Sequence, residues 1–321
     1  MTNSPEVFYA KIMLFGEYSV ICDSMGLTIP YAHFKGEFGF LNKYRYTDHD
    51  FAIDSNKLLR EYHTHLAELQ EKGELKCILD LERFRKEIGS NLFFESTIPQ
   101  GFGIGSSGAL CAAIYQRYAK NKIRSQRNLK QEEVRRLKEI FAQMENYFHG
   151  ISSGIDPLNC YLKYPLLING ETGIRVVGIP RNKFPREGAI FLVDTGRPGI
   201  THPLVSLFFE KCQDPAFDKL INETLIPLND TCIHSLLEGK TDVFFPALHE
   251  LSAFQYKHLR PMIPDSVISI WKAGLDKKVY SLKLCGSGGG GFILGFTQDF
   301  EASLKSLKSQ GQKVIAVYKN S

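Results

Sequence analysis

The pattern of apolar and polar residues changes character several times along this chain of 321 residues. Residues 7–53 are rich in β-forming residues and alternate in part, which predicts strands separated by turns. Residues 55–72 carry leucines and a tyrosine at helical spacing, which predicts an amphipathic helix with one broad apolar face. Residues 92–99 predict a strand that ends at Pro99, and residues 107–119 predict a helix.

A longer helix is predicted at residues 129–148, because apolar residues recur there at steps of three and four. These residues are Val134, Leu137, Phe141, Met144 and Phe148. Asn128 and Gln131 have the spacing of a capping box, which predicts that the helix starts close to residue 129.

The pattern restarts near residue 175 and ends in a β-β-α-β unit. The expected elements are a strand at 189–196, helices across 203–259 and at 265–275, strands at 279–286 and 291–296, a helix at 301–310 and a strand at 313–318. Strands and helices mix without strict βαβ alternation, which favours an α+β fold. The turn-rich segment 178–188 is the best boundary, so we expect two domains, 1–180 and 181–321.

Composition narrows the class of protein. The chain is 43% hydrophobic and 23% charged, with a formal net charge of +4, and its only basic run, at 120–130, is typical of a solvated loop. We therefore expect no nucleic-acid partner. No segment approaches the ~18 apolar residues of a membrane span, so we expect no membrane partner. The seven cysteines form no C-x-x-C pair, which favours reduced thiols in the cytoplasm over a zinc site or a disulfide framework.

The most informative stretch is PQGFGIGSSGA, from Pro99 to Ala109, where a strand is followed by a helix. It lacks the lysine of a Walker A loop. Gly103, Gly105 and Gly108 match G-x-G-x-x-G, but the polar stretch about 20 residues later lacks the strand-ending acid of a dinucleotide site, so a dinucleotide-binding oxidoreductase stays a distant alternative. A third design remains: glycine N–H groups and a helix N-terminus bind phosphate without a lysine. A purely structural turn is the alternative.

Two further stretches carry residues that a plain structural role explains poorly. In YAKIMLFGEYSV, Lys11 and Glu17 are charges within an apolar segment, where isolated charges are costly unless paired. In KLCGSGGGGFILGF, at 283–296, four consecutive glycines stand between two apolar strands. Glycine weakens a strand, so close contact of the backbone with a ligand or another loop is the better explanation.

Together the three stretches resemble the GHMP kinase family, whose motifs they match in family order. The resemblance implies a two-domain α+β fold, with an N-terminal domain like ribosomal protein S5 domain 2 and a C-terminal ferredoxin-like β-α-β unit. Within the family the chain is most similar to the mevalonate kinases. The stretch MENYFHGISSGID supplies Glu145 and Asp156 at their spacing of 11 residues, together with an H-G pair that includes His149.

This resemblance implies ATP-dependent phosphorylation of the primary alcohol of a small carboxylate, mevalonate, to 5-phosphomevalonate in isoprenoid biosynthesis, with ATP and Mg²⁺ as cofactors. Asp156 and Lys11 would be catalytic, and Glu145 with Ser106 or Ser107 would hold Mg²⁺. The nucleotide-binding residues would be Gly101, Gly103, Gly105, Ser106, Ser107 and Gly108, and the substrate-binding residues Glu17, Tyr18, Thr201 and Gly288. His149 is assigned a structural role.

Two departures from the family pattern leave the substrate open. Tyr18 stands where the family has histidine, and Phe254 replaces an asparagine before Gln255. A phosphomevalonate kinase or another GHMP small-molecule kinase is therefore the alternative, and a non-catalytic nucleotide-binding homologue is a more distant one. The sequence also leaves open whether the protein forms a homodimer.

Overall fold

A computed structural model describes residues 6–41, 48–170, 173–180, 183–199 and 201–320, without the side chains of residues 201 and 202. The chain forms two compact units that are interleaved in sequence. The first unit takes residues 1–11, 30–99 and 105–164, and the second takes 12–29, 100–104 and 165–321. The predicted domain boundary after residue 180 stays a prediction.

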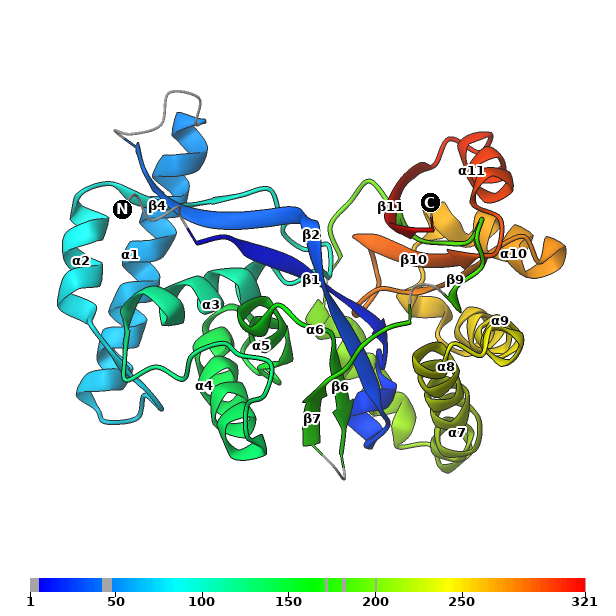
Figure 1. Ribbon diagram of the computed structural model, residues 1–321, viewed down its shortest axis with the longest axis horizontal. Coiled ribbons are helices and arrows are strands. Elements are labelled where there is room, and N and C mark those ends of the chain that lie inside the picture. The colour runs from blue at the N-terminus through cyan, green and yellow to red at the C-terminus, as the bar shows by residue number, and fades with distance from the viewer. Residues whose placement is uncertain (1–5, 42–47, 171–172, 181–182, 200, 321) are drawn as a thin grey trace. The chain divides into compact units, whose positions relative to one another are not determined.

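The first unit is built mainly of helices. Its elements are α1 (His49–Glu71), β3 (Ile78–Leu79), α2 (Leu81–Gly89), β4 (Leu92–Ser96), α3 (Ser106–Tyr118), β5 (Ala119–Lys120), α4 (Gln131–His149) and α5 (Ile155–Leu162), with parts of β1 (Phe8–Phe15) and β2 (Gly26–Phe40). Helices α3, α4 and α5 pack side by side (Figure 1). The small residues of α3 make this possible, because Ala109, Cys111 and Ala112 are completely buried.

One sheet has five strands, in the order β1-β2-β6-β7, with β4 also paired to β2. Strand β4 pairs antiparallel with the end of β2, where Phe38 lies opposite Phe94. Strand β6 (Leu166–Asn169) pairs with the beginning of β2 and with β7 (Gly173–Val176).

The start of each long helix in the first unit differs from the prediction. Helix α4 begins at Gln131, and the acid that closes its first turn is Glu133, which accepts the Lys130 N–H at 2.9 Å. The predicted capping box of Asn128 and Gln131 is therefore wrong. Helix α1 begins six residues before the predicted start of 55, because the Asp48 carboxylate accepts the N–H groups of the first turn.

The second unit contains a four-stranded antiparallel sheet in the order β11-β8-β10-β9. Its strands are β8 (Ala189–Asp194), β9 (Ser281–Leu284), β10 (Phe292–Thr297) and β11 (Lys313–Lys319), and its helices are α6 (Thr201–Cys212), α7 (Pro215–Leu220), α8 (Ile226–Glu238), α9 (Thr241–His258), α10 (Ile268–Lys277) and α11 (Phe300–Lys308). Short 3₁₀-helices lie at Ser19–Cys22, Arg260–Met262 and Asp265–Val267, and a π-helical turn lies at Ile221–Leu225. The predicted C-terminal β-β-α-β unit is confirmed as β9, β10, α11 and β11, and the α+β class is confirmed.

Helices α8 and α9 lie side by side in the second unit (Figure 1). Trp271 of α10 is fully buried there, and its indole N–H donates to the Ser252 hydroxyl of α9 at 3.0 Å. Among the residues that the structure describes, no helix combines the length and apolar character needed to cross a membrane.

Candidate active site

The glycine loop delivers its two serines to the first turn of α3. Gly105 is the residue before the helix, with φ of 81°, and no described side chain caps the N–H groups that follow it. These N–H groups and the positive end of the helix can therefore receive an anion. Ser106 and Ser107 are the first two residues of the helix.

Two glycines allow the catalytic candidates to approach this turn. A Cβ on Gly105 would lie 2.9 Å from Cγ of Lys11, and a Cβ on Gly108 would lie 2.8 Å from the backbone nitrogen of Pro157. Both distances are shorter than ordinary contacts, so a side chain at either position would push neighbouring groups away. The glycines thus bring α3 against β1 on one side and against the beginning of α5 on the other.

Lys11 and Asp156 form an ion pair within the first unit. Lys11 Nζ lies 2.9 Å from Asp156 Oδ1, with the lysine side chain 4% and the aspartate side chain 31% exposed. Lys11 stands on strand β1, and Asp156 stands in the first turn of α5. The buried ammonium is thus neutralised by a carboxylate that remains accessible to a substrate.

Glu145, near the end of α4, is buried and held by two serine hydroxyls. Ser107 Oγ donates to Oε1 at 2.8 Å, and Ser152 Oγ donates to Oε2 at 2.5 Å. Burial, and next the charge of Asp156, raise the pKa of Glu145 to about 7, although both serines and Lys11 act in the opposite direction.

His149 joins the same group from the last turn of α4. Its Nε2 lies 2.9 Å from Ser107 Oγ. Because the single hydroxyl hydrogen of Ser107 points to Glu145, the His149 N–H is the donor to the serine oxygen. Burial lowers the pKa of His149, which favours the neutral ring. The sequence predicts a structural role for His149 at the end of the helix but not its contact with Ser107.

The donor set around Glu145 fits Mg²⁺ in chemistry. It offers a carboxylate and a hydroxyl, the hard oxygen ligands that Mg²⁺ prefers, and leaves the remaining positions for water and phosphate. Within the described ranges, no group of three His, Cys, Asp or Glu side chains could hold a metal by itself. Of the two predicted serine ligands, Ser107 lies beside Glu145, whereas the Ser106 hydroxyl makes no hydrogen bond to another described residue.

The predicted residues of the second unit gather around the tetraglycine stretch. Glu17 Oε2 accepts a hydrogen bond from Lys283 Nζ at 2.6 Å, and both side chains are at most 2% exposed. The other carboxylate oxygen, Oε1, is buried and has no hydrogen-bond partner among the described residues. The Tyr18 hydroxyl donates to the Ser287 carbonyl at 2.6 Å, and its backbone φ is 65°. Gly288 lies directly against the Met262 carbonyl.

The remaining predicted site residues divide between the two units. Gly101 and Gly103 belong to the second unit, where the Gly101 carbonyl accepts the Gly199 N–H at 2.7 Å and Gly103 lies against the Cys285 carbonyl. Thr201 is the first residue of α6, and its side chain lies outside the described residues. The first unit thus brings together Lys11, Gly105, Ser107, Gly108, Glu145 and Asp156.

Sequence reasoning missed two residues that touch the predicted ones. Lys283 is a single charge inside the apolar strand β9, a signal that could have predicted its buried ion pair with Glu17. Ser152 had no comparable signal, since serine is ordinary in a loop between helices.

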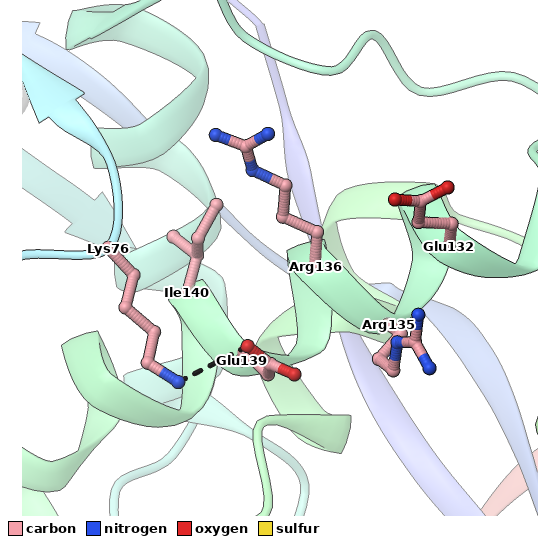
Figure 2. A pocket seen from close by; sticks show the side chains of 6 residues that line it. All are labelled: Lys76, Glu132, Arg135, Arg136, Glu139 and Ile140. Carbon is pink, nitrogen blue, oxygen red and sulfur yellow. Dashed lines mark hydrogen bonds and ion pairs between the residues drawn. The ribbon is translucent and has the colours of Figure 1, made fainter.

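A separate pocket of about 600 Å³ lies beside α4 in the first unit. Its lining residues are Lys76, Glu132, Arg135, Arg136, Glu139 and Ile140 (Figure 2). Lys76 is paired with Glu139 at 3.2 Å, and Figure 2 shows the Arg136 side chain extending away from that pair. None of the predicted site residues lines this pocket.

Comparison with known proteins identifies the architecture. Residues 74–163 match the family model described as GHMP kinases N terminal domain. The fold is similar to that of L. major mevalonate kinase in complex with R-mevalonate, with TM-score 0.62, 18% identity and coverage of 98% of this chain and 95% of that one. For Methanococcus jannaschii mevalonate kinase the TM-score is 0.60, with 15% identity and 98% of each chain covered.

Streptococcus pneumoniae phosphomevalonate kinase, in complex with phosphomevalonate and AMPPNP, is also similar, with TM-score 0.57, 15% identity and coverage of 98% of this chain and 99% of that one. Comparison with curated protein sequences gives no match. The predicted GHMP kinase resemblance and fold are confirmed, while identities this low leave the substrate undetermined.

Proposed function

We propose that this chain, which carries a GHMP kinase N-terminal domain at residues 74–163 and has the fold of GHMP kinases, transfers the γ-phosphoryl group of ATP to the primary alcohol of mevalonate. The observation that carries the proposal is the Lys11–Asp156 ion pair at 2.9 Å, close enough to Glu145 for Asp156 to raise the pKa of that acid. Phosphoryl transfer depends mainly on positioning and charge neutralisation, which such a group can supply.

Asp156 is proposed to accept a hydrogen bond from the attacking alcohol and thereby orient it or take its proton. Its partly exposed carboxylate leaves room for this contact. Lys11 pairs with Asp156 and offers positive charge where negative charge develops on the transferred group. Because Lys11 is buried and fixed by its partner, this charge needs no rearrangement during the reaction.

Glu145 and Ser107 are proposed to hold Mg²⁺, with Ser106 as the less favoured of the two serine ligands. When bound there, Mg²⁺ would neutralise the charge of the nucleotide phosphates. The backbone N–H groups from Gly105 to Gly108 would bind phosphate oxygens at the start of α3. Gly101 and Gly103, earlier in the same glycine-rich stretch, are proposed as further nucleotide-binding residues.

Glu17, Tyr18, Thr201 and Gly288 are proposed to contact the alcohol substrate. Glu17 Oε1 supports this proposal, because a buried carboxylate oxygen without a partner gains from a donor such as a substrate hydroxyl. Mevalonate is preferred as substrate because two of the similar structures are mevalonate kinases, one of them in complex with R-mevalonate.

The test is ADP release by the purified protein with MgATP and one acceptor at a time. The acceptors are mevalonate, phosphomevalonate, diphosphomevalonate, homoserine and galactose. We expect turnover with mevalonate alone. Turnover with phosphomevalonate instead would make this a phosphomevalonate kinase, and no turnover with any acceptor would favour a non-catalytic nucleotide-binding protein.

Asp156→Asn tests the catalytic assignment. We expect turnover to fall by about 100-fold or more, as for loss of a general base, while the affinity for MgATP stays close to that of the wild type. Asp54→Asn, at an exposed position on α1, is the control and should keep full turnover. Wild-type turnover of Asp156→Asn would remove this residue from the mechanism.

A further inference from the structure

Ser152, a loop residue, makes three hydrogen bonds through its backbone and its side chain. It lies in the segment between α4 and α5, where its N–H donates to Asn146 Oδ1 at 2.8 Å. Its hydroxyl oxygen accepts the Gly154 N–H at 3.0 Å, and its hydroxyl hydrogen goes to Glu145 Oε2 at 2.5 Å. Three hydrogen bonds therefore fix both the backbone and the side chain of this one residue.

The result is a carboxylate fixed at both oxygens from two different elements. Ser107, from the first turn of α3, holds Oε1 of Glu145, and Ser152, from the loop after α4, holds Oε2. A carboxylate that receives two fixed donors has a set orientation and keeps its remaining lone pairs directed to one place. Removing Ser152 would leave Oε2 of a buried acid without this donor.

Ser152 also couples Glu145 to the element that carries Asp156. Gly154, whose N–H the serine accepts, is the residue that precedes α5, and Asp156 stands in the first turn of that helix. The backbone at Gly154 packs directly on the Lys138 carbonyl of α4, so the loop has little room to shift. One hydroxyl therefore links the two acids of the proposed site.

The neighbouring Ser153 lacks these contacts. It is exposed, and among the described residues its hydroxyl oxygen accepts only the Ile155 N–H, at a long 3.4 Å. Two adjacent serines with different surroundings thus provide a matched comparison within one loop.

We propose that Ser152 is a positioning residue, which orients the Glu145 carboxylate for the divalent cation that accompanies the nucleotide. This inference rests on the proposed function and deepens it. Ser152 acts through Glu145 and does not itself contact the nucleotide or the alcohol. Its loss should therefore weaken the metal-dependent part of nucleotide binding and leave the metal-independent part unchanged.

The experiment compares Ser152→Ala and Ser153→Ala with the wild type by calorimetric titration of ADP, once with Mg²⁺ and once with EDTA. We expect Ser152→Ala to reduce the gain in ADP affinity that Mg²⁺ provides by about 10-fold, the lower end for loss of a group that orients a metal ligand. With EDTA its affinity should match the wild type. Ser153→Ala should stay within about twofold in both buffers.

A second readout is direct binding of Mn²⁺ to the enzyme–ADP complex by electron paramagnetic resonance, where Ser152→Ala should show the same loss. Ser152→Thr keeps a hydroxyl and should restore most of the affinity. If Ser152→Ala does not fold, Ser152→Cys replaces it with a weaker donor of similar shape and is judged in the same way.

Equal Mg²⁺ dependence in the two alanine variants would overturn the inference. An equal loss of ADP affinity with and without Mg²⁺ would also overturn it, since that pattern indicates a general structural role. A wild-type protein whose ADP binding does not respond to Mg²⁺ would instead contradict the proposed function, so the two failures can be told apart.

Discussion

Replacing Glu145 by glutamine should remove a loss of stability that the wild-type protein suffers as the pH rises. In the folded protein the pKa of Glu145 is about 7, compared with an ordinary value of 4.5. The unfolded chain therefore releases this proton first, and the free energy of unfolding falls between about pH 4.5 and pH 7. At 1.36 kcal/mol for each pH unit, the difference amounts to about 3 kcal/mol.

Other ionisable groups close to Glu145 also contribute to the pH dependence of the free energy of unfolding. Asp156 raises the pKa of Glu145, and Lys11 opposes it. Burial lowers the pKa of His149, which contributes the opposite slope below about pH 6.5. Cys111 and Tyr62 stay protonated throughout, because burial raises the pKa of each well above its ordinary value. The difference between wild type and Glu145→Gln isolates the glutamate.

Unfolding in urea should be followed by far-ultraviolet circular dichroism at steps from pH 4.5 to pH 8, in EDTA. The single tryptophan, Trp271, belongs to the second unit, whereas α4 belongs to the first. Glu132→Gln, at an exposed position on the same helix, serves as the control and should follow the wild type. Parallel pH curves for wild type and Glu145→Gln would refute the reasoning. Added Mg²⁺ should reduce the wild-type loss, because a cation binds the ionised acid.

Two further predictions concern packing. Lys283→Met leaves the Glu17 carboxylate buried without a cation and should lower the free energy of unfolding by about 3–5 kcal/mol. In urea denaturation the double variant Glu17→Gln/Lys283→Met should recover most of this loss. Equal stability of the single and double variants would contradict the prediction. Gly108→Ala places a Cβ 2.8 Å from the Pro157 nitrogen and should displace Asp156. We therefore expect turnover in the ADP-release assay to fall by about 10-fold or more. Unchanged turnover would show that α3 and α5 accommodate the added methyl group without moving Asp156.

Local patterns predicted much of the secondary structure, because periodicity reports which face of an element is buried. The apolar stripe at 129–148 corresponds to α4, and the C-terminal strands and helix lie within a few residues of their predicted positions. Helix α2, strand β6 and strand β7 were not predicted. Helix α2 is only nine residues long, and each of these strands has four residues, too few for a clear period.

The sequence by itself determined which functional groups are available for a site. These are a glycine loop without a lysine, charged residues in an apolar strand, and two acids 11 residues apart. Only the tertiary structure decided which groups meet. Lys11 reaches Asp156 and Glu17 reaches Lys283 across long stretches of chain, and Ser152, not Ser153, holds Glu145. Side chains distant in sequence are joined by the packing of whole elements, which is set by the sum of many buried contacts and leaves no local signal.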